Sequence, residues 1–219
     1  MATKLLILGK GDNNITMILD NLYSMWSEGP KIGVHVYNNL NLPILNTFEH
    51  DRFNIEMFNT VNMDDYDLMA LGVYQPSHKI KIVETLNPDK NKFMNIIHDG
   101  LDISYTSKLG RGLLINSKVS IAAHTTIGDF VSINRHVSIG HHTNVGDYCS
   151  INPGVNIAGN VTIGEGTTIG MGANIIDGVK IGKNSIIGAG SVVTKDIPDN
   201  VIAYGNPCKI IRDNETQSI

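Results

Sequence analysis

The sequence is poor in the features that mark several large classes of protein. Two cysteines in 219 residues are too few for a disulfide framework or a zinc knuckle. The net charge is −4 and no cluster of Lys and Arg stands out, so a nucleic-acid partner is not expected. The sequence contains no run of 18 apolar residues, the length needed to cross a membrane, and the N-terminus has no signal-peptide pattern. We therefore expect a cytoplasmic protein without membrane insertion.

The second half of the chain contains one strict pattern, an aliphatic residue at every sixth position. A period of six fits no helix or ordinary sheet and is typical of a solenoid of short parallel strands. Three hexads would form one coil, so residues 18 apart would stack, roughly 4.8 Å apart, in about five coils. The phase never slips, so no loop is expected between coils. The aliphatic residues are Ile103, Leu109, Ile115, Ile121, Ile127, Ile133, Ile139, Val145, Ile151, Ile157, Ile163, Ile169, Ile175, Ile181, Ile187 and Val193.

Two other hexad positions support the same architecture. The fifth position is small or β-branched from Thr125 to Ser191, with Cys149 among its members, and should also point inward. The fourth should form the corners, because it often holds Gly or Asn, which tolerate left-handed backbone. Parallel crossovers are usually right-handed, but hexapeptide solenoids are the exception. We expect a left-handed parallel β-helix over residues 100–212, including a C-terminal extension, and a flexible tail over 213–219.

Residues 1–99 lack the repeat and alternate between strand and helix patterns. Strands are predicted at 4–8, 31–37 and 67–72, and helices at about 14–26 and 77–86, which indicates a small Rossmann-like parallel sheet. The first strand ends in Gly9-Lys10-Gly11, and a Gly-rich turn that opens a helix can bind phosphate on its N–H groups. The full dinucleotide fingerprint is absent, so a plain tight turn is the alternative. Residues 93–97 should bridge the two units.

Four histidines occur within nineteen residues of the early coils: His124, His136, His141 and His142. None occupies an inward position, and His124 and His142, which are 18 apart, should stack on one edge. One imidazole could act as a general base toward an amine or hydroxyl that attacks an acyl thioester. Alternatively, three imidazoles could bind zinc, since the spacing of His136 and His141 resembles that in γ-class carbonic anhydrases. That family's remaining histidine would fall near position 100, which is Gly here.

Three segments carry a more specific resemblance. Residues 133–142 read Ile-Asn-Arg-His-Val-Ser-Ile-Gly-His-His, and residues 157–164 read Ile-Ala-Gly-Asn-Val-Thr-Ile-Gly. The ending Gly-Ala-Gly-Ser-Val-Val-Thr-Lys-Asp-Ile-Pro at 188–198, followed by Gly-Asn-Pro-Cys-Lys at 205–209, is widely shared by hexapeptide acyltransferases. On these residues the chain resembles, along nearly its whole length, the NeuD/PglD-like family of bacterial sugar acyltransferases.

The resemblance implies an acetyl-CoA-dependent N-acetyltransferase that modifies the amino group of a nucleotide-linked amino-deoxy sugar for cell-surface glycan synthesis. It implies a homotrimer whose active sites lie between subunits and which needs no metal. His141 would be the general base, the neighbouring His142 would belong to the catalytic group, and the Gly159 N–H would stabilise the oxyanion. Asn134 would lie near the sugar.

The remaining implied sites divide between the two substrates. The N-terminal unit would hold the nucleotide sugar. Acetyl-CoA would lie between two solenoids, with its pantetheine beside Gly159 and its adenine near the C-terminus. The sugar-nucleotide residues would be Gly9, Lys10, Gly11, Asn38 and Gly72, and the CoA residues would be Gly159, Met171, Gly172, Ala189 and Pro207.

The chain departs from the family pattern at two positions in the second half. An acidic residue usually follows the catalytic histidine, whereas here it is His142, so Asp147 or a neighbouring subunit is expected to orient His141. A second family histidine maps to Ser150, which could at most donate a hydroxyl to the acyl carbonyl. Two further alternatives stay open: O-acetylation of a sugar hydroxyl, as on sialic acid, and a non-catalytic solenoid used for assembly.

Overall fold

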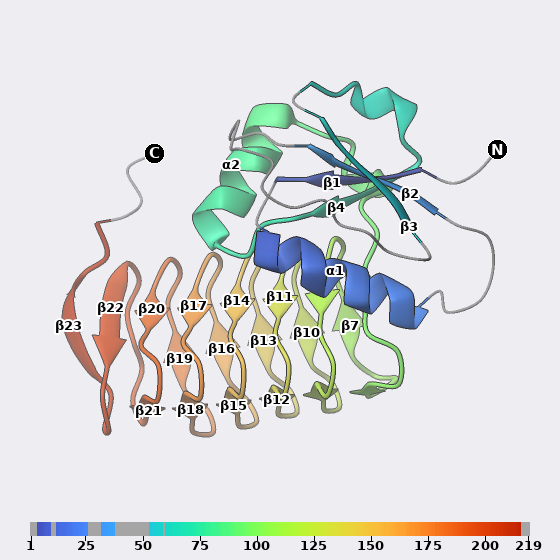
Figure 1. Cartoon of the computed structure of the whole chain (residues 1–219). Coiled ribbons are helices and arrows are strands. Elements are labelled where there is room, and N and C mark those ends of the chain that lie inside the picture. Colours follow the sequence, from blue (N-terminus) through green and yellow to red (C-terminus); the bar gives the residue numbers. More distant parts are fainter. Residues whose placement is uncertain (1–3, 10–11, 26–31, 38–52, 59, 216–219) are drawn as a thin grey trace.

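The computed structural model describes residues 4–9, 12–25, 32–37, 53–58 and 60–215. An N-terminal α/β unit lies along one face of a C-terminal solenoid (Figure 1). No helix in the described ranges is long and apolar enough to span a membrane. The solenoid is a left-handed parallel β-helix, as the hexad pattern predicts.

The N-terminal unit is a four-stranded parallel sheet in the order β3-β2-β1-β4. Every strand and helix predicted here is present within two residues of its expected bounds, and β3 was not predicted. Its sequence, Phe-Asn-Ile-Glu-Met-Phe, alternates apolar and polar residues at first, as an edge strand often does. The elements are β1 (Lys4–Leu8), α1 (Asp12–Met25), β2 (Ile32–Tyr37), β3 (Phe53–Phe58), η1 (Met63–Asp65), β4 (Leu68–Leu71), α2 (Pro76–Leu86) and η2 (Lys90–Lys92).

The sheet is covered on both faces, which explains why β1 is apolar throughout. Leu5 and Ile7 pack with residues of α1, whereas Leu6 and Leu8 pack with residues of α2. All four side chains are fully buried. Such continuous apolar runs are typical of parallel strands between two helical layers.

The solenoid has three faces, built of two-residue strands apart from β22 and β23 at its C-terminal end. We call the face under the N-terminal unit the covered face, and the next two along the chain the first and second side faces. The covered face holds β5 (Ile96–Ile97), β8 (Leu114–Ile115), β11 (Ser132–Ile133), β14 (Ser150–Ile151), β17 (Thr168–Ile169), β20 (Ile186–Ile187), β22 (Val201–Tyr204) and the antiparallel β23 (Lys209–Asp213).

The first side face holds β6 (Asp102–Ile103), β9 (Ser120–Ile121), β12 (Ser138–Ile139), β15 (Asn156–Ile157), β18 (Asn174–Ile175) and β21 (Val192–Val193). The second side face holds β7 (Lys108–Leu109), β10 (Thr126–Ile127), β13 (Asn144–Val145), β16 (Thr162–Ile163) and β19 (Lys180–Ile181). Paired residues are 18 apart, as predicted: Ile133 pairs with Ile151, and Ile139 with Ile157.

The solenoid is longer than the repeat alone predicts. Ile97 lies one hexad before the first aliphatic residue that we identified, and β5 pairs with β8. At the other end β22 continues the covered face after the hexad pattern breaks. Asp213 ends β23, and Asn214 donates its backbone N–H to Asn200 O (2.8 Å), so this contact falls within the expected tail.

The inward and corner positions behave as expected. The fifth-position side chains from Thr125 to Ser191 are buried, with Cys149 fully buried, and burial raises the pKa of its thiol to about 12. The corners have positive φ, between 54° and 74° in the Gly and Asn residues of the later coils. The same left-handed backbone occurs at His124, His136 and His142, where it is less favourable than for Gly.

A polar seam joins the two units across the covered face. Lys79 of α2 is fully buried, and its Nζ donates to Phe130 O (2.9 Å), Ser132 Oγ (3.1 Å) and Cys149 O (3.0 Å). Ser150 is also buried and donates its hydroxyl to Tyr74 O. Ser150 therefore serves the contact between the units, where its one hydroxyl proton is already donated.

Candidate functional site

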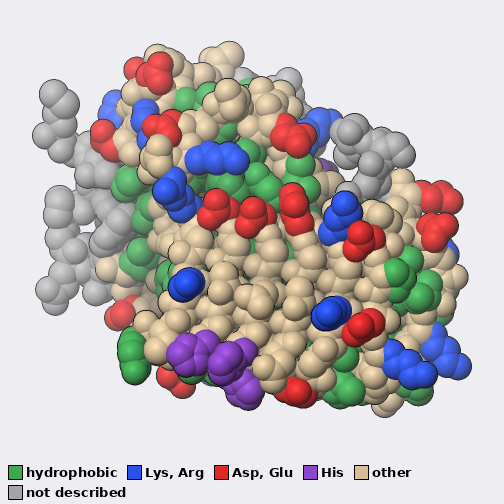
Figure 2. Space-filling view, turned by 180° about the vertical axis from the view of Figure 1, so that it is seen from behind, with side chains coloured by type: hydrophobic (Ala, Val, Ile, Leu, Met, Phe, Trp, Pro, Cys, Tyr) green, Lys and Arg blue, Asp and Glu red, His purple; other side chains and the backbone are tan. Residues whose placement is uncertain are grey.

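One edge of the solenoid carries His141. This edge, which we call the histidine edge, joins the first and second side faces and lies opposite the covered face. Figure 2 shows histidine side chains gathered near the lower margin of the molecule, on the side away from the N-terminal unit. Stacked coils place six residues along the edge at intervals of 18: Tyr105, Ala123, His141, Gly159, Asp177 and Lys195.

His141 and Gly159 are brought together, although they are a whole coil apart in sequence. A Cβ atom on Gly159 would lie 2.6 Å from His141 Cε1 and 2.7 Å from His141 Nε2. The imidazole therefore occupies the space that any larger residue at 159 would fill. No acceptor for the Gly159 N–H is found within the described ranges, so this donor is available to a ligand.

His142 contacts His141 directly. The two Nδ1 atoms are 3.1 Å apart, so one ring must donate and the other must accept. If His142 accepts, His141 carries its proton on Nδ1 and keeps a lone pair on Nε2, the nitrogen beside Gly159. The His142 ring also lies 4.9 Å, centroid to centroid, from that of His124, so the two residues lie one above the other on one edge as predicted, with their rings tilted by 43°.

Asp147 cannot orient His141 in the same chain. It lies on the edge between the second side face and the covered face, where its Oδ1 accepts the Asp129 N–H (2.8 Å). The nearby carboxylate is instead Asp177, whose Oδ1 is 3.0 Å from the point where a Cβ of Gly159 would lie. The sequence contained the signal, because Asp177 lies two coils after His141, but we did not apply the register to it.

The described residues do not form the alternative zinc site. His136 lies on the edge between the covered face and the first side face, whereas His141 lies on the histidine edge. No group of three or more His, Cys, Asp or Glu side chains in the described ranges is placed to hold a metal ion.

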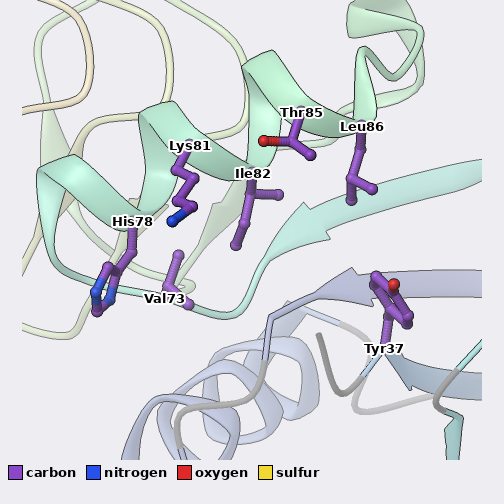
Figure 3. Close-up of a pocket in the computed structure, with 7 residues that line it drawn as sticks. All are labelled: Tyr37, Val73, His78, Lys81, Ile82, Thr85 and Leu86. Carbon is purple, nitrogen blue, oxygen red and sulfur yellow. The ribbon is translucent and has the colours of Figure 1, made fainter. Parts of the chain in front are cut away.

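A second candidate site lies at the carboxyl ends of the N-terminal strands. Gly72 donates its N–H to Leu8 O (2.8 Å), and a Cβ on Gly72 would lie 2.2 Å from Gly9 O, so the two turns pack backbone to backbone. Beside them is a cavity of about 350 Å³. Figure 3 shows side chains of α2 projecting toward Tyr37 at the end of β2. The lining residues are Tyr37, Val73, His78, Lys81, Ile82, Thr85 and Leu86.

This cavity suits a nucleotide. Open α/β sheets bind ligands in the crevice outside the carboxyl ends of their strands. Lys81 and His78 supply basic side chains, and Tyr37 supplies an aromatic surface. Gly9 and Gly72 lie at this end of the sheet, whereas Lys10, Gly11 and Asn38 fall outside the described residues.

Asn134 lies apart from His141. It is buried between the units, where its Oδ1 accepts the Arg135 N–H (2.8 Å), and the Tyr74 hydroxyl donates to Ile151 O (3.4 Å). Burial raises the pKa of that hydroxyl. Asn134 and Arg135 also line a cavity of about 240 Å³ against α1. Within one chain, therefore, this residue faces the N-terminal unit and not the histidine edge.

The residues expected to bind CoA occupy two places. Met171, which is 59% exposed, lies on the edge between the covered and first side faces, and its carbonyl accepts the N–H of Gly190, which follows Ala189. Gly172 belongs to the same corner. Pro207 follows a cis peptide bond in the exposed turn between β22 and β23. Gly159 is on the histidine edge, across the first side face from Met171.

Part of the solenoid matches a known sequence family. Residues 142–176 and 160–195 match the bacterial transferase hexapeptide (six repeats) model. A comparison with curated protein sequences gave no match.

Similarity to solved structures extends over both units. PerB from Caulobacter crescentus, in complex with CoA and GDP-perosamine, has a TM-score of 0.81 at 25% identity, covering 96% of this chain and 98% of that one. Two variants of that enzyme, with Asn or Ala replacing a histidine, were also solved with CoA and GDP-perosamine.

Two more distant structures share the fold. The acetyltransferase domain of PglB from Neisseria gonorrhoeae has a TM-score of 0.80 at 23% identity, covering 95% of this chain and 99% of that one. WeeI from Acinetobacter baumannii has a TM-score of 0.80 at 21% identity, with 95% and 100% covered. The chain is thus similar over nearly its whole length to sugar acetyltransferases of the NeuD/PglD type, and its solenoid carries the hexapeptide repeat of bacterial transferases.

Proposed function

We propose that this protein transfers the acetyl group of acetyl-CoA to the amino group of a nucleotide-linked amino-deoxy sugar. The observation that carries the proposal is the seating of the His141 imidazole over Gly159, with Nε2 beside a free backbone N–H. A base and an oxyanion donor side by side are what acyl transfer requires. The similarity to PerB, solved with CoA and GDP-perosamine, supports the choice of substrates.

The chemistry proceeds by direct attack. The amine lone pair forms a C–N bond with the thioester carbonyl, and His141 Nε2 takes a proton from the attacking nitrogen. The oxyanion accepts a hydrogen bond from the Gly159 N–H. The C–S bond then breaks, and the leaving sulfur takes the proton from the imidazolium. The bond to His142 Nδ1 holds the His141 tautomer whose Nε2 is free to accept.

A complete site requires more than one chain. The nucleotide cavity is in the unit on the covered face, and the histidine edge is opposite that face. In a homotrimer with solenoids side by side, the N-terminal unit of one subunit can approach the histidine edge of another. CoA would lie between two solenoids, along a first side face whose far edge carries Met171, Gly172 and Ala189. The turn at Pro207 is at the end where the adenine would lie.

Release of free thiol from acetyl-CoA tests the proposal. The acceptors are UDP-, GDP- and dTDP-linked 4-amino and 3-amino sugars, with CMP-sialic acid and free sialic acid as hydroxyl acceptors. We expect release with one nucleotide-linked amino sugar. Release only with a hydroxyl acceptor would make the protein an O-acetyltransferase. Silence across the panel, with CoA bound, would overturn the assignment of the N-terminal unit to nucleotide sugars.

A further inference from the structure

Aspartates at the solenoid edges have a common structural use in this chain. Asp129 Oδ1 accepts the N–H of Arg111, and Asp147 Oδ1 accepts the N–H of Asp129, each at 2.8 Å. In both pairs the donor lies 18 residues before the acceptor. A carboxylate in this register therefore caps the turn of the coil before it.

Asp177 has the same register to Gly159 but is not used in this way. No bond from the Gly159 N–H to Asp177 is found within the described ranges. The Asp177 Oδ1 atom accepts instead from Asn160 Nδ2 (3.1 Å), and its side chain is exposed. The carboxylate therefore does not cap the turn that its register offers it, and it lies beside Gly159 at the candidate active site.

The position of Asp177 relative to His141 is fixed closely. His141 Nε2 is 2.7 Å and Asp177 Oδ1 is 3.0 Å from the same point beside Gly159, so the two atoms are at most 5.7 Å apart, the sum of these distances. A charge-assisted N–H···O bond is about 2.8 Å long. One nitrogen outside Gly159 can therefore reach both the base and the carboxylate.

We propose that Asp177 binds the ammonium form of the acceptor's amino group and makes the enzyme select amines over hydroxyls. This inference rests on the acetyl transfer proposed above. An amine arrives mostly protonated at neutral pH, and a carboxylate attracts this cation but gains no charge interaction with a hydroxyl. The ammonium loses one proton to solvent before attack. The second proton passes to His141 as the C–N bond forms, so the products are the amide, free CoA thiol and one proton.

The decisive experiment compares Asp177→Asn with Glu165→Gln, which removes an equal charge from an exposed residue of another solenoid edge. We expect Asp177→Asn to lower kcat/KM for the amino sugar by roughly 10- to 100-fold, the scale of one hydrogen bond to a charged group. The Ki of the matching hydroxyl sugar nucleotide should not change. The ratio of the wild-type kcat/KM to the Asp177→Asn kcat/KM should fall as the pH rises, because the amino group of the unbound acceptor then loses the charge that Asp177 attracts. Glu165→Gln should behave as wild type.

Other outcomes separate the two proposals. If the wild-type protein acetylates an amino sugar but Asp177→Asn leaves kcat/KM unchanged, the role of Asp177 is refuted and acetyl transfer stands. Asp177→Asn could also weaken amino-sugar turnover and hydroxyl-sugar binding equally, with a ratio of wild-type to variant kcat/KM that does not vary with pH. That result would show that Asp177 is only structural. If the wild-type protein acetylates no amino sugar, the proposed function fails and this inference fails with it. A thermal melt of each variant checks that the fold is intact.

Discussion

At the scale of single residues, the candidate site depends on the missing side chain at Gly159 as much as on the imidazole of His141. The His141 imidazole can lie against the next coil only because residue 159 has no side chain. Its other side is held by His142, whose backbone is left-handed with φ 56°. This conformation belongs to the corner and not to the histidine, because Lys118, Phe130 and Tyr148 adopt it at other corners of the solenoid.

Replacing His141 tests the general base. We expect His141→Ala to reduce kcat by at least roughly 10²-fold, because general-base catalysis typically contributes 10²–10⁴. CoA binding and the oligomeric state should not change, since His141 is exposed and its side chain lies outside the core. Steady-state kinetics and a CoA titration measure both effects. Unchanged turnover would remove His141 from the mechanism.

Alanine substitutions at Gly159 and Gly154 should have opposite effects on activity and stability. Gly159→Ala should lower kcat strongly while changing stability by less than about 1 kcal/mol, because the new Cβ collides with the movable end of the His141 side chain. Gly154→Ala meets no atom within 4 Å but sits at φ 70°, so it should cost about 1 kcal/mol of stability and leave kcat intact. Kinetics and denaturant melts of both variants give the comparison. The reverse pattern would mean that the space over Gly159 does not serve the imidazole.

His142→Gly should separate stability from activity in the other direction. Glycine relieves the left-handed backbone and should stabilise the fold by up to about 1 kcal/mol, less whatever the stack on His124 contributes. Turnover should fall, because the Nδ1 partner of His141 is lost. The melting temperature and kcat of one preparation provide the measurement. Retention of full kcat would show that His141 keeps its tautomer without this neighbour.

At the scale of elements, helix α2 contacts the solenoid through the buried amine of Lys79. Burial lowers the pKa of Lys79 from 10.5 to about 7, although its Nζ has three acceptors. A depressed folded pKa means that the unfolded chain binds the extra proton between about pH 7 and 10.5. The contribution of this group to stability therefore rises with pH through that window.

Comparison with Lys79→Met isolates this dependence. The free energy of unfolding of wild type minus that of the variant should increase between pH 7 and 10, with a slope of up to about 1.4 kcal/mol per pH unit. Urea unfolding at several pH values measures it, and titrations elsewhere in the chain cancel in the difference. A difference that stays flat or declines would mean that Lys79 remains charged in the folded protein.

Most elements could be predicted because each obeys a local rule. The hexad residues from Ile103 to Val193 specify strand, inward face and corner from six positions at a time, and β1 shows its two-sided burial in an unbroken apolar run. The strand β3 was detectable from its alternation and was missed. The start of the solenoid was placed too late, because β5 at Ile96–Ile97 already pairs with β8 before the first hexad that we identified.

Site residues were harder to predict because edges depend on register over whole coils. His141 and Gly159 were found through motif resemblance, and the 18-residue register explains their contact. Asp177 was missed, although the same register gives it. The contacts of Asn134 and Ser150 could not be read from the repeat, because they depend on how the N-terminal unit lies on the covered face.

At the scale of the whole molecule, the cavity proposed to hold the nucleotide and the histidine edge belong to opposite sides of one chain. A mixture of two inactive variants tests whether subunits share a site. His141→Ala lacks the base, and Lys81→Glu places a negative charge in the nucleotide cavity. Coexpressed in equal amounts and randomly assembled, they should recover activity in about a quarter of the sites, because each site then draws its two halves from different chains.

The control for this test is a mixture of the separately purified variants that have not exchanged subunits, which should stay inactive. Coexpressed variants that also remain inactive, with mixed oligomers demonstrated by mass, would place the whole site within one chain. Light scattering of the wild-type protein should give three times the mass of the 23.9 kDa chain. A monomer of full activity would exclude the shared site.

The unbroken 18-residue register has a consequence for how such an enzyme can change. Equivalent residues of the histidine edge are separated by whole coils, each about 4.8 Å high. An insertion of six residues would rotate everything after it onto another face, whereas an insertion of 18 would preserve each face and only lengthen the molecule. The distance between the acid and the base along this edge can therefore be altered in evolution or by design only in discrete steps.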